Sequence, residues 1–86
     1  MKNKILITVY AISIDEYYDV FIPINDLMGE VVNLICKTIK GMTDSTFEEK
    51  IGLALLDANE GKFYDFSVPV SDTNLKNGKK VILFNY

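Results

Sequence analysis

The stretch DLMGEVVNLICKTIKG, residues 26–41, has the spacing of an amphipathic helix and decides the fold. Its apolar residues recur at steps of three and four positions, which places them on one helical face. That face comprises Met28, Val31, Val32, Ile35, Cys36 and Ile39. We expect the side chain of Asn25 or Asp26 to cap the N-terminus, and Gly41 to end the helix in the left-handed conformation.

On both sides of this helix the sequence has the composition of β-strands, rich in Ile, Val and aromatic residues. Residues 4–11 and 17–24 predict a hairpin before the helix, and residues 51–57 predict a strand after it. Residues 63–70 predict a short, irregular edge strand because they contain a proline. Residues 79–86 predict the last strand. One helix covers one face of a mixed sheet of four or five strands, so we expect an α+β roll.

The polar connections between these elements contain isolated apolar residues. Phe47 lies in the connection of residues 42–50, and Leu75 lies in that of residues 72–78. We expect the Phe47 side chain to attach its connection to the core. Asn77 and Gly78 together are typical of a turn before the last strand.

The length and composition predict one domain, residues 1–86. A chain of 86 residues, 49% hydrophobic and 24% charged, is long enough for one compact core and too short for two. The apolar run Ile5–Ile14 follows two lysines, as in a secretion signal, but polar residues interrupt it, so we interpret it as a strand. No stretch approaches the roughly 20 apolar residues of a membrane helix, so we expect no direct membrane insertion.

The residue types that are missing exclude several classes of function. The chain has no His and no Arg, so it lacks the usual general base, the commonest metal ligand and the bidentate phosphate clamp. Its net charge of −3 and the lack of a basic run argue against a nucleic-acid partner. Cys36 is the single cysteine, which fits a reducing cytoplasm and, on the apolar helical face, a packing role. We expect no enzyme, no catalytic residue, no metal site and no cofactor.

Two groups of acidic residues are interpreted as solvated turns. Asp15, Glu16 and Asp19 lie around the first hairpin, and Asp57 and Glu60 flank a later turn. Their spacing matches no EF-hand loop, because the bidentate glutamate at its end is missing.

The surplus of apolar residues on the strands indicates a function, because some of them are expected on an exposed face of the sheet. One helix leaves the outer face of the sheet open, and strand alternation places a set of apolar side chains there. The candidate protein-binding residues are Leu6, Tyr10, Ala54, Leu56, Ile82 and Phe84. This set requires Val81 and Leu83 to point inward, and alternation alone leaves the register of the first and last strands open. Contiguous apolar patches on a monomer usually mark interaction sites.

The stretch VSDTNLKNGKKVIL, residues 70–83, resembles the last part of ubiquitin-like domains. Like those domains, it has a Ser-Asp start, one aliphatic residue, Leu75, which the resemblance implies is buried, an Asn-Gly turn and an aliphatic strand. With the helix placed after a hairpin, the whole order resembles the ubiquitin-like β-grasp fold. The chain ends LFNY rather than in a flexible Gly-Gly tail, so we expect neither conjugation nor sulfur transfer.

Within this superfamily, the length, the run of residues 51–57 followed by an Asn/Lys-type turn, and the abrupt ending are similar to those of the bacterial YukD (EsaB) family. Members of that family are cytosolic accessory proteins of type VII secretion systems. The resemblance implies a non-catalytic cytoplasmic interaction module whose sheet face binds a protein partner, such as a membrane component of the secretion system. Two alternatives stay open. One is a structural homodimer or self-assembling protein with no secretion role, and the other is an enzyme or small-ligand binder.

Overall fold

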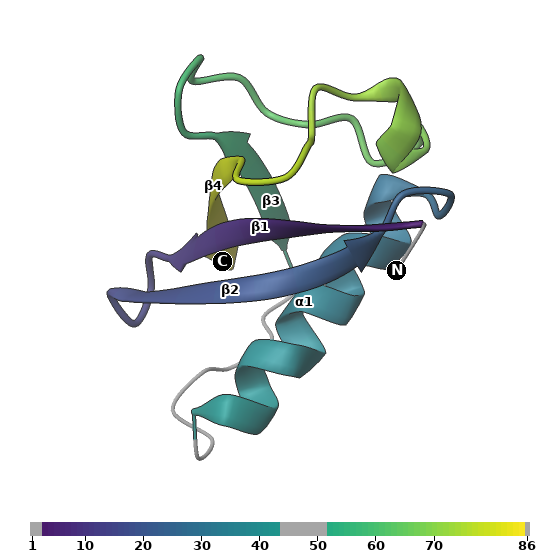
Figure 1. The fold of residues 1–86 in the computed structure, drawn as a ribbon. Helices are drawn as coiled ribbons and strands as arrows, with labels where there is room; N and C mark the ends of the chain where they lie inside the picture. Colours follow the sequence, from purple (N-terminus) through teal and green to yellow (C-terminus); the bar gives the residue numbers. More distant parts are fainter. Residues whose placement is uncertain (1–2, 44–51, 86) are drawn as a thin grey trace.

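The computed structural model describes residues 3–43 and 52–85, which form a four-stranded sheet with one helix against one face (Figure 1). The hairpin strands are β1 (Lys4–Ala11) and β2 (Glu16–Pro23), which pair in antiparallel register. The turn between them spans residues 12–15, so Glu16 and Asp19, expected in solvated turns, are exposed residues of β2 instead.

The later strands complete the sheet in the order β2-β1-β4-β3. Strand β4 (Lys80–Asn85) pairs parallel to β1 in the middle of the sheet, and β3 (Leu53–Asp57) pairs antiparallel to β4 at one edge. The mixed sheet with one α-helix, found within the described residues, confirms the predicted α+β roll. The predicted strand ends at Ile51 and Tyr86, and the predicted anchor Phe47, lie outside the described residues.

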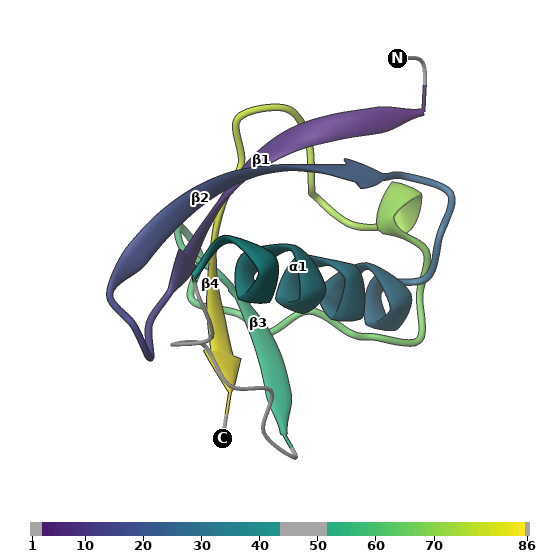
Figure 2. The ribbon, with the colours of Figure 1, turned by 90° about the horizontal axis from the view of Figure 1, so that it is seen from below.

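Helix α1 (Met28–Met42) lies across the sheet and buries the predicted apolar face (Figure 2). All six residues of that face are buried, and they form one core with the inward side chains of the strands. Leu34, on the outer side of the helix, stays 43% exposed. The period of the apolar residues therefore predicts correctly which side of the helix faces the sheet.

Both predicted caps of this helix are wrong. At its start the helix begins at Met28, two residues later than predicted, so the N-cap residue is Leu27, whose side chain has no polar atom to cap the helix. The amides of Met28 and Gly29 instead donate to the backbone carbonyls of Val68 and Phe66, at 2.8 and 3.0 Å. At its end, the helix continues through Gly41 to Met42 with Thr43 as the C-cap. A distant chain segment thus satisfies donors that a local side chain usually satisfies.

Asp26→Ala is expected to change the free energy of unfolding by less than about 0.5 kcal/mol, because the Asp26 side chain caps nothing. Loss of a genuine N-cap side chain costs about 1 kcal/mol. Urea denaturation followed by circular dichroism measures the difference. A loss of about 1 kcal/mol or more would contradict this capping arrangement.

The predicted edge strand over residues 63–70 is also wrong. Two isolated bridges, Leu56 with Phe63 and Leu27 with Pro69, stand in its place, and a 3-10 turn follows at Val70–Asp72. Two sets of hydrogen bonds compete with strand pairing here. The Asp65 carboxylate accepts hydrogen bonds from the amide and hydroxyl of Ser67, which form a local turn. The carbonyls of Phe66 and Val68 accept amides of helix α1 instead of strand partners.

The loop before β4 is anchored as the sequence predicts. Leu75 is buried, and Gly78 adopts a positive φ of 86°, a conformation that glycine adopts without steric cost. The turn also extends the pairing with β1: the amide of Leu6 donates to Asn77 Oδ1, and the amide of Gly78 donates to the Leu6 carbonyl, both at 2.8 Å. Of the helices in residues 3–43 and 52–85, none has the length and apolar character needed to cross a bilayer.

Candidate protein-binding face of the sheet

The register of the strands places the six candidate residues on the face of the sheet opposite helix α1. Val81 and Leu83 are buried and point inward with Leu55 of the neighbouring strand, so the register of β4 left open by the sequence is the one that the candidate set requires. The outward residues are half-buried: Leu6, Tyr10, Ala54, Leu56, Ile82 and Phe84. We call this surface the outer face.

Five side chains form a continuous row across the outer face at right angles to the strands. Each stands directly opposite the next in the pairing register, in the order Tyr17, Tyr10, Ile82, Leu56 and Phe63. The rings of Tyr10 and Tyr17 lie 4.7 Å apart between centroids. At the other end, the ring of Phe63 lies 6.1 Å from that of Phe84. We call these five residues the apolar stripe.

Sequence reasoning missed both ends of the apolar stripe. Tyr17 is 69% exposed and Phe63 is 66% exposed, and Phe21 on the same face is 53% exposed. Alternation within the second hairpin strand carries the signal for Tyr17 and Phe21, since they are four residues apart. Phe63 had no such signal, because it joins the face through an isolated bridge to Leu56.

Polar groups border the apolar stripe at its β2 end. The Thr8 hydroxyl donates to Asp19 Oδ1 at 2.8 Å, and the Tyr10 hydroxyl donates to Asp15 Oδ1 at 2.5 Å. The bond to Asp15 is the main reason that the pKa of Tyr10 is raised above its ordinary value, since ionisation would remove the donated proton. These two bonds hold the tyrosine and the neighbouring strand residues in place on the outer face.

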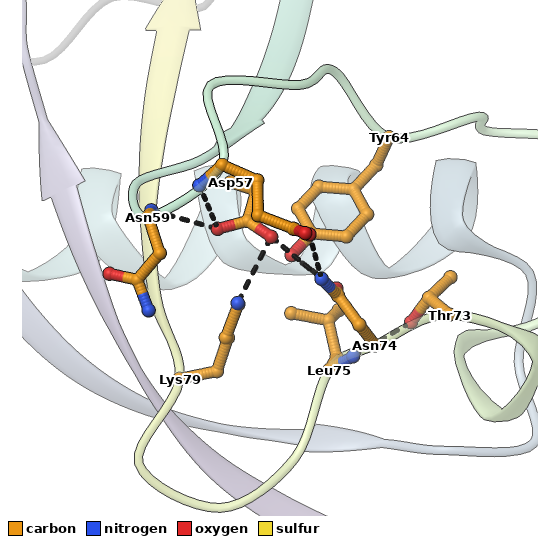
Figure 3. Close-up of polar contacts among 8 residues, drawn as sticks. Asp57, Asn59, Tyr64, Thr73, Asn74, Leu75 and Lys79 are labelled. Carbon is orange, nitrogen blue, oxygen red and sulfur yellow. Dashed lines mark hydrogen bonds and ion pairs between the residues drawn. The ribbon is translucent and has the colours of Figure 1, made fainter.

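Asp57 is buried, which corrects its interpretation as a solvated turn residue. Its Oδ1 accepts the amides of Asn59 and Glu60 at 2.8 and 3.2 Å (Figure 3). Its Oδ2 accepts Asn74 Nδ2 at 2.6 Å and pairs with Lys79 Nζ at 3.0 Å. The carboxylate therefore joins the end of β3 to the loop and the residue that lead into β4.

The hydrogen bonds around Asp57 control its ionisation. Burial alone would raise its pKa, but the bonds from Asn74, Lys79 and the two turn amides outweigh burial and hold the pKa well below its ordinary value. Nearby, the Tyr64 hydroxyl donates to Asn74 Oδ1 at 2.8 Å. Burial, followed by the negative charges of Asp57 and Glu60, raises the pKa of Tyr64. The group is thus charged at Asp57 and neutral at Tyr64 around neutral pH.

The contacts of Asp57 also hold the turn of residues 57–62, which leads to the outer face. Besides the carboxylate bonds, the Gly61 amide donates to the Asp57 carbonyl, and the Asp57 amide donates to the Lys62 carbonyl, both at 2.8 Å. This turn leads directly to Phe63, the end of the apolar stripe. Within the described parts of the chain, no group of three or more His, Cys, Asp or Glu residues is arranged to hold a metal ion, and Cys36 is fully buried in the core.

Comparison with solved structures identifies the fold. The ubiquitin-like domain of the Mycobacterium tuberculosis type VII secretion protein EccD1 matches with a TM-score of 0.72 at 11% identity, over 93% of this chain and 96% of that one. The fold is ubiquitin-like. A chain of the MycP5-free ESX-5 inner membrane complex matches with a TM-score of 0.77 at 12% identity, over 95% of this chain. This ubiquitin-like chain spans 21% of that longer chain.

Proteins of other functions share the same fold. A chain of the toluene 4-monooxygenase HD complex matches with a TM-score of 0.74 at 10% identity, over 93% of this chain and 95% of that one. No protein-family model matches the sequence, and no curated protein matches it. The fold alone therefore does not identify the function of this chain.

Proposed function

We propose that this protein is a non-catalytic, cytoplasmic interaction module that binds a protein partner through the outer face and serves as an accessory of a type VII secretion system. The observation that carries the proposal is the apolar stripe, which crosses the whole sheet on the face that helix α1 leaves open.

The chemistry of the apolar stripe supports protein binding. Three of its five side chains are aromatic, and aromatic residues are enriched in protein interfaces and among the residues that dominate binding energy. Burying apolar surface contributes roughly 25 cal/mol per Å², less the cost of ordering both partners. A row held by cross-strand pairing needs little further ordering, so more of that gain appears as affinity.

The secretion role is supported by likeness in fold and in sequence pattern. One of the solved structures with this fold is the ubiquitin-like domain of a type VII secretion protein, and another is a chain of the ESX-5 inner membrane complex. The strand of residues 51–57 with the Asn/Lys-type turn after it adds the resemblance to YukD-type accessory proteins. The proposed partner is therefore a protein of the membrane complex of such a secretion system.

The non-catalytic role is supported by the residue types that the chain lacks and by the burial of its cysteine and of Asp57. The chain has no His or Arg, its cysteine is buried, and the buried carboxylate of Asp57 is held by hydrogen bonds and an ion pair within the fold. None of these groups is placed to exchange a proton with a substrate.

Replacing both ends of the apolar stripe, Tyr17→Asp with Phe63→Asp, is expected to reduce partner capture at least tenfold. Both side chains are mostly exposed, so the double variant keeps its core, and each new charge has to be desolvated in the interface. Tagged protein incubated with cytosol and solubilised membranes, followed by quantitative mass spectrometry, measures the loss.

Leu34→Asp is the matched control, because Leu34 is an exposed apolar residue on the opposite side of the molecule. It is expected to capture the partner as the unchanged protein does. Equal capture by all three proteins would refute binding through the outer face. Recovery of the bait alone, with a molar mass that rises with concentration in light scattering, would favour the self-assembling alternative.

A further inference from the structure

We infer that the partner segment bound by the outer face is an amphipathic α-helix that lies across the strands, along the apolar stripe, with an acidic residue beside Lys80. This inference rests on the proposed function and specifies the partner's chemistry.

The length and spacing of the apolar stripe match one helical face. Four of its residues stand on the four neighbouring strands, and Phe63 follows Leu56 through the isolated bridge. Neighbouring positions are about 4.8 Å apart, so the stripe is roughly 19 Å long. A helix rises about 5.4 Å per turn, which is close to the spacing between strands. One side chain from each turn of the helix can therefore contact one position of the stripe. A helix of about 13 residues covers the stripe. A second apolar row beside it, with Ala54 opposite Phe84, widens the surface toward the diameter of a helix.

Backbone hydrogen bonding favours a helix over an extended segment. The central strands β1 and β4 each pair with neighbours on both sides, so their backbone groups are used within the sheet. An extended peptide on this face would bury its own amides and carbonyls against apolar side chains without partners, which is costly. A helix satisfies those groups internally. An added strand would instead have to bind at an edge, away from the stripe.

Charge and shape fix one polar contact of the bound helix. Beside the stripe, a hollow of about 300 Å³ is lined by Tyr10, Tyr17 and Ile82 on one side, and by Thr8, Ala58 and Lys80 on the other. Lys80 is exposed, and it has no ion pair with any other residue in the described ranges 3–43 and 52–85. Asp19, in contrast, already accepts the Thr8 hydroxyl. A glutamate beside the helix's apolar row therefore complements this side of the stripe.

The test uses three synthetic peptides of about 14 residues, titrated into isotope-labelled protein and followed by amide chemical shifts, which detect weak binding. The first has Leu at helical steps of three and four with Glu beside the Leu row. The second has the same composition with Leu at alternate positions, as in a strand. The third is the first with each Glu replaced by Lys.

We expect the first peptide to shift the amides of the apolar stripe and to bind about tenfold more tightly than the second. Lys80→Glu is expected to reverse the preference between the first and third peptides. Leu34→Asp should leave all three affinities unchanged. The amides that shift should belong to four strands at once, which binding at an edge does not produce.

Equal or tighter binding of the strand-like peptide, or shifts confined to β2 or β3, would overturn the inference. Lack of binding by the first peptide would also overturn it, as would stripe shifts that appear on concentrating the protein alone, since a second copy would then be the occupant. The capture experiment separates the two claims. If the stripe variants lose a native partner while the helical peptide fails, only the helical partner is refuted, and if capture is unaffected, the proposed function is refuted.

Discussion

Ile35→Ala is expected to lower the free energy of unfolding by about 2–5 kcal/mol. Ile35 is fully buried in the middle of helix α1, on the face that packs against the sheet. Truncation removes the transfer free energy of the lost methyl groups and leaves a cavity that the core fills only in part. A domain of this size has a total stability of roughly 4–13 kcal/mol, so the variant loses a large share of it.

Leu34→Ala provides the control at the neighbouring position, since its side chain is exposed and its effect should stay within about 0.5 kcal/mol. Urea denaturation of the two variants under identical conditions gives both values. If Leu34→Ala were the more damaging change, the orientation of helix α1 on the sheet would be wrong.

Asp57→Asn is expected to lower the melting temperature at pH 7 several times more than Asp26→Ala does. The amide keeps the shape of the carboxylate but loses its charge, so it cannot pair with Lys79, and it brings a second amide group against Asn74. Removing one partner of a buried, hydrogen-bonded pair leaves the other in an unfavourable environment. Thermal unfolding followed by circular dichroism measures the loss.

The difference in melting temperature between the unchanged protein and the Asp57→Asn variant should depend on pH in one direction. Folding lowers the pKa of Asp57 below its ordinary value of 3.8, so the unfolded chain takes up a proton first as the pH falls. The stabilisation from the carboxylate is therefore fully present above about pH 5, and it is lost as the pH falls through the pKa of the folded state. The melting temperatures of the two proteins should converge in acid. A difference that stayed constant from pH 7 to acid would show that the charge of Asp57 contributes nothing.

Much of the fold follows from local patterns in the sequence. The helical period identifies the buried face of α1, because side chains at steps of three and four share one side. Alternation similarly predicts that Ala54 and Leu56 share a face, and that Ile82 and Phe84 share one. Where a local signal competes with a distant one, the prediction fails. The sequence predicts a cap from the side chain of Asn25 or Asp26, but the carbonyls of residues 66 and 68 accept the first amides of the helix instead.

The sequence by itself determined the class of fold, the buried face of the helix and most of the outer face, because each depends on a period of two or 3.6 residues along one element. Only the tertiary structure decided which residues meet across elements. It placed Phe63 beside Leu56 at the end of the apolar stripe, and it buried Asp57 among Asn74 and Lys79. The physical reason is that these contacts join segments far apart in the chain, whose side chains have no common period to show that they will meet.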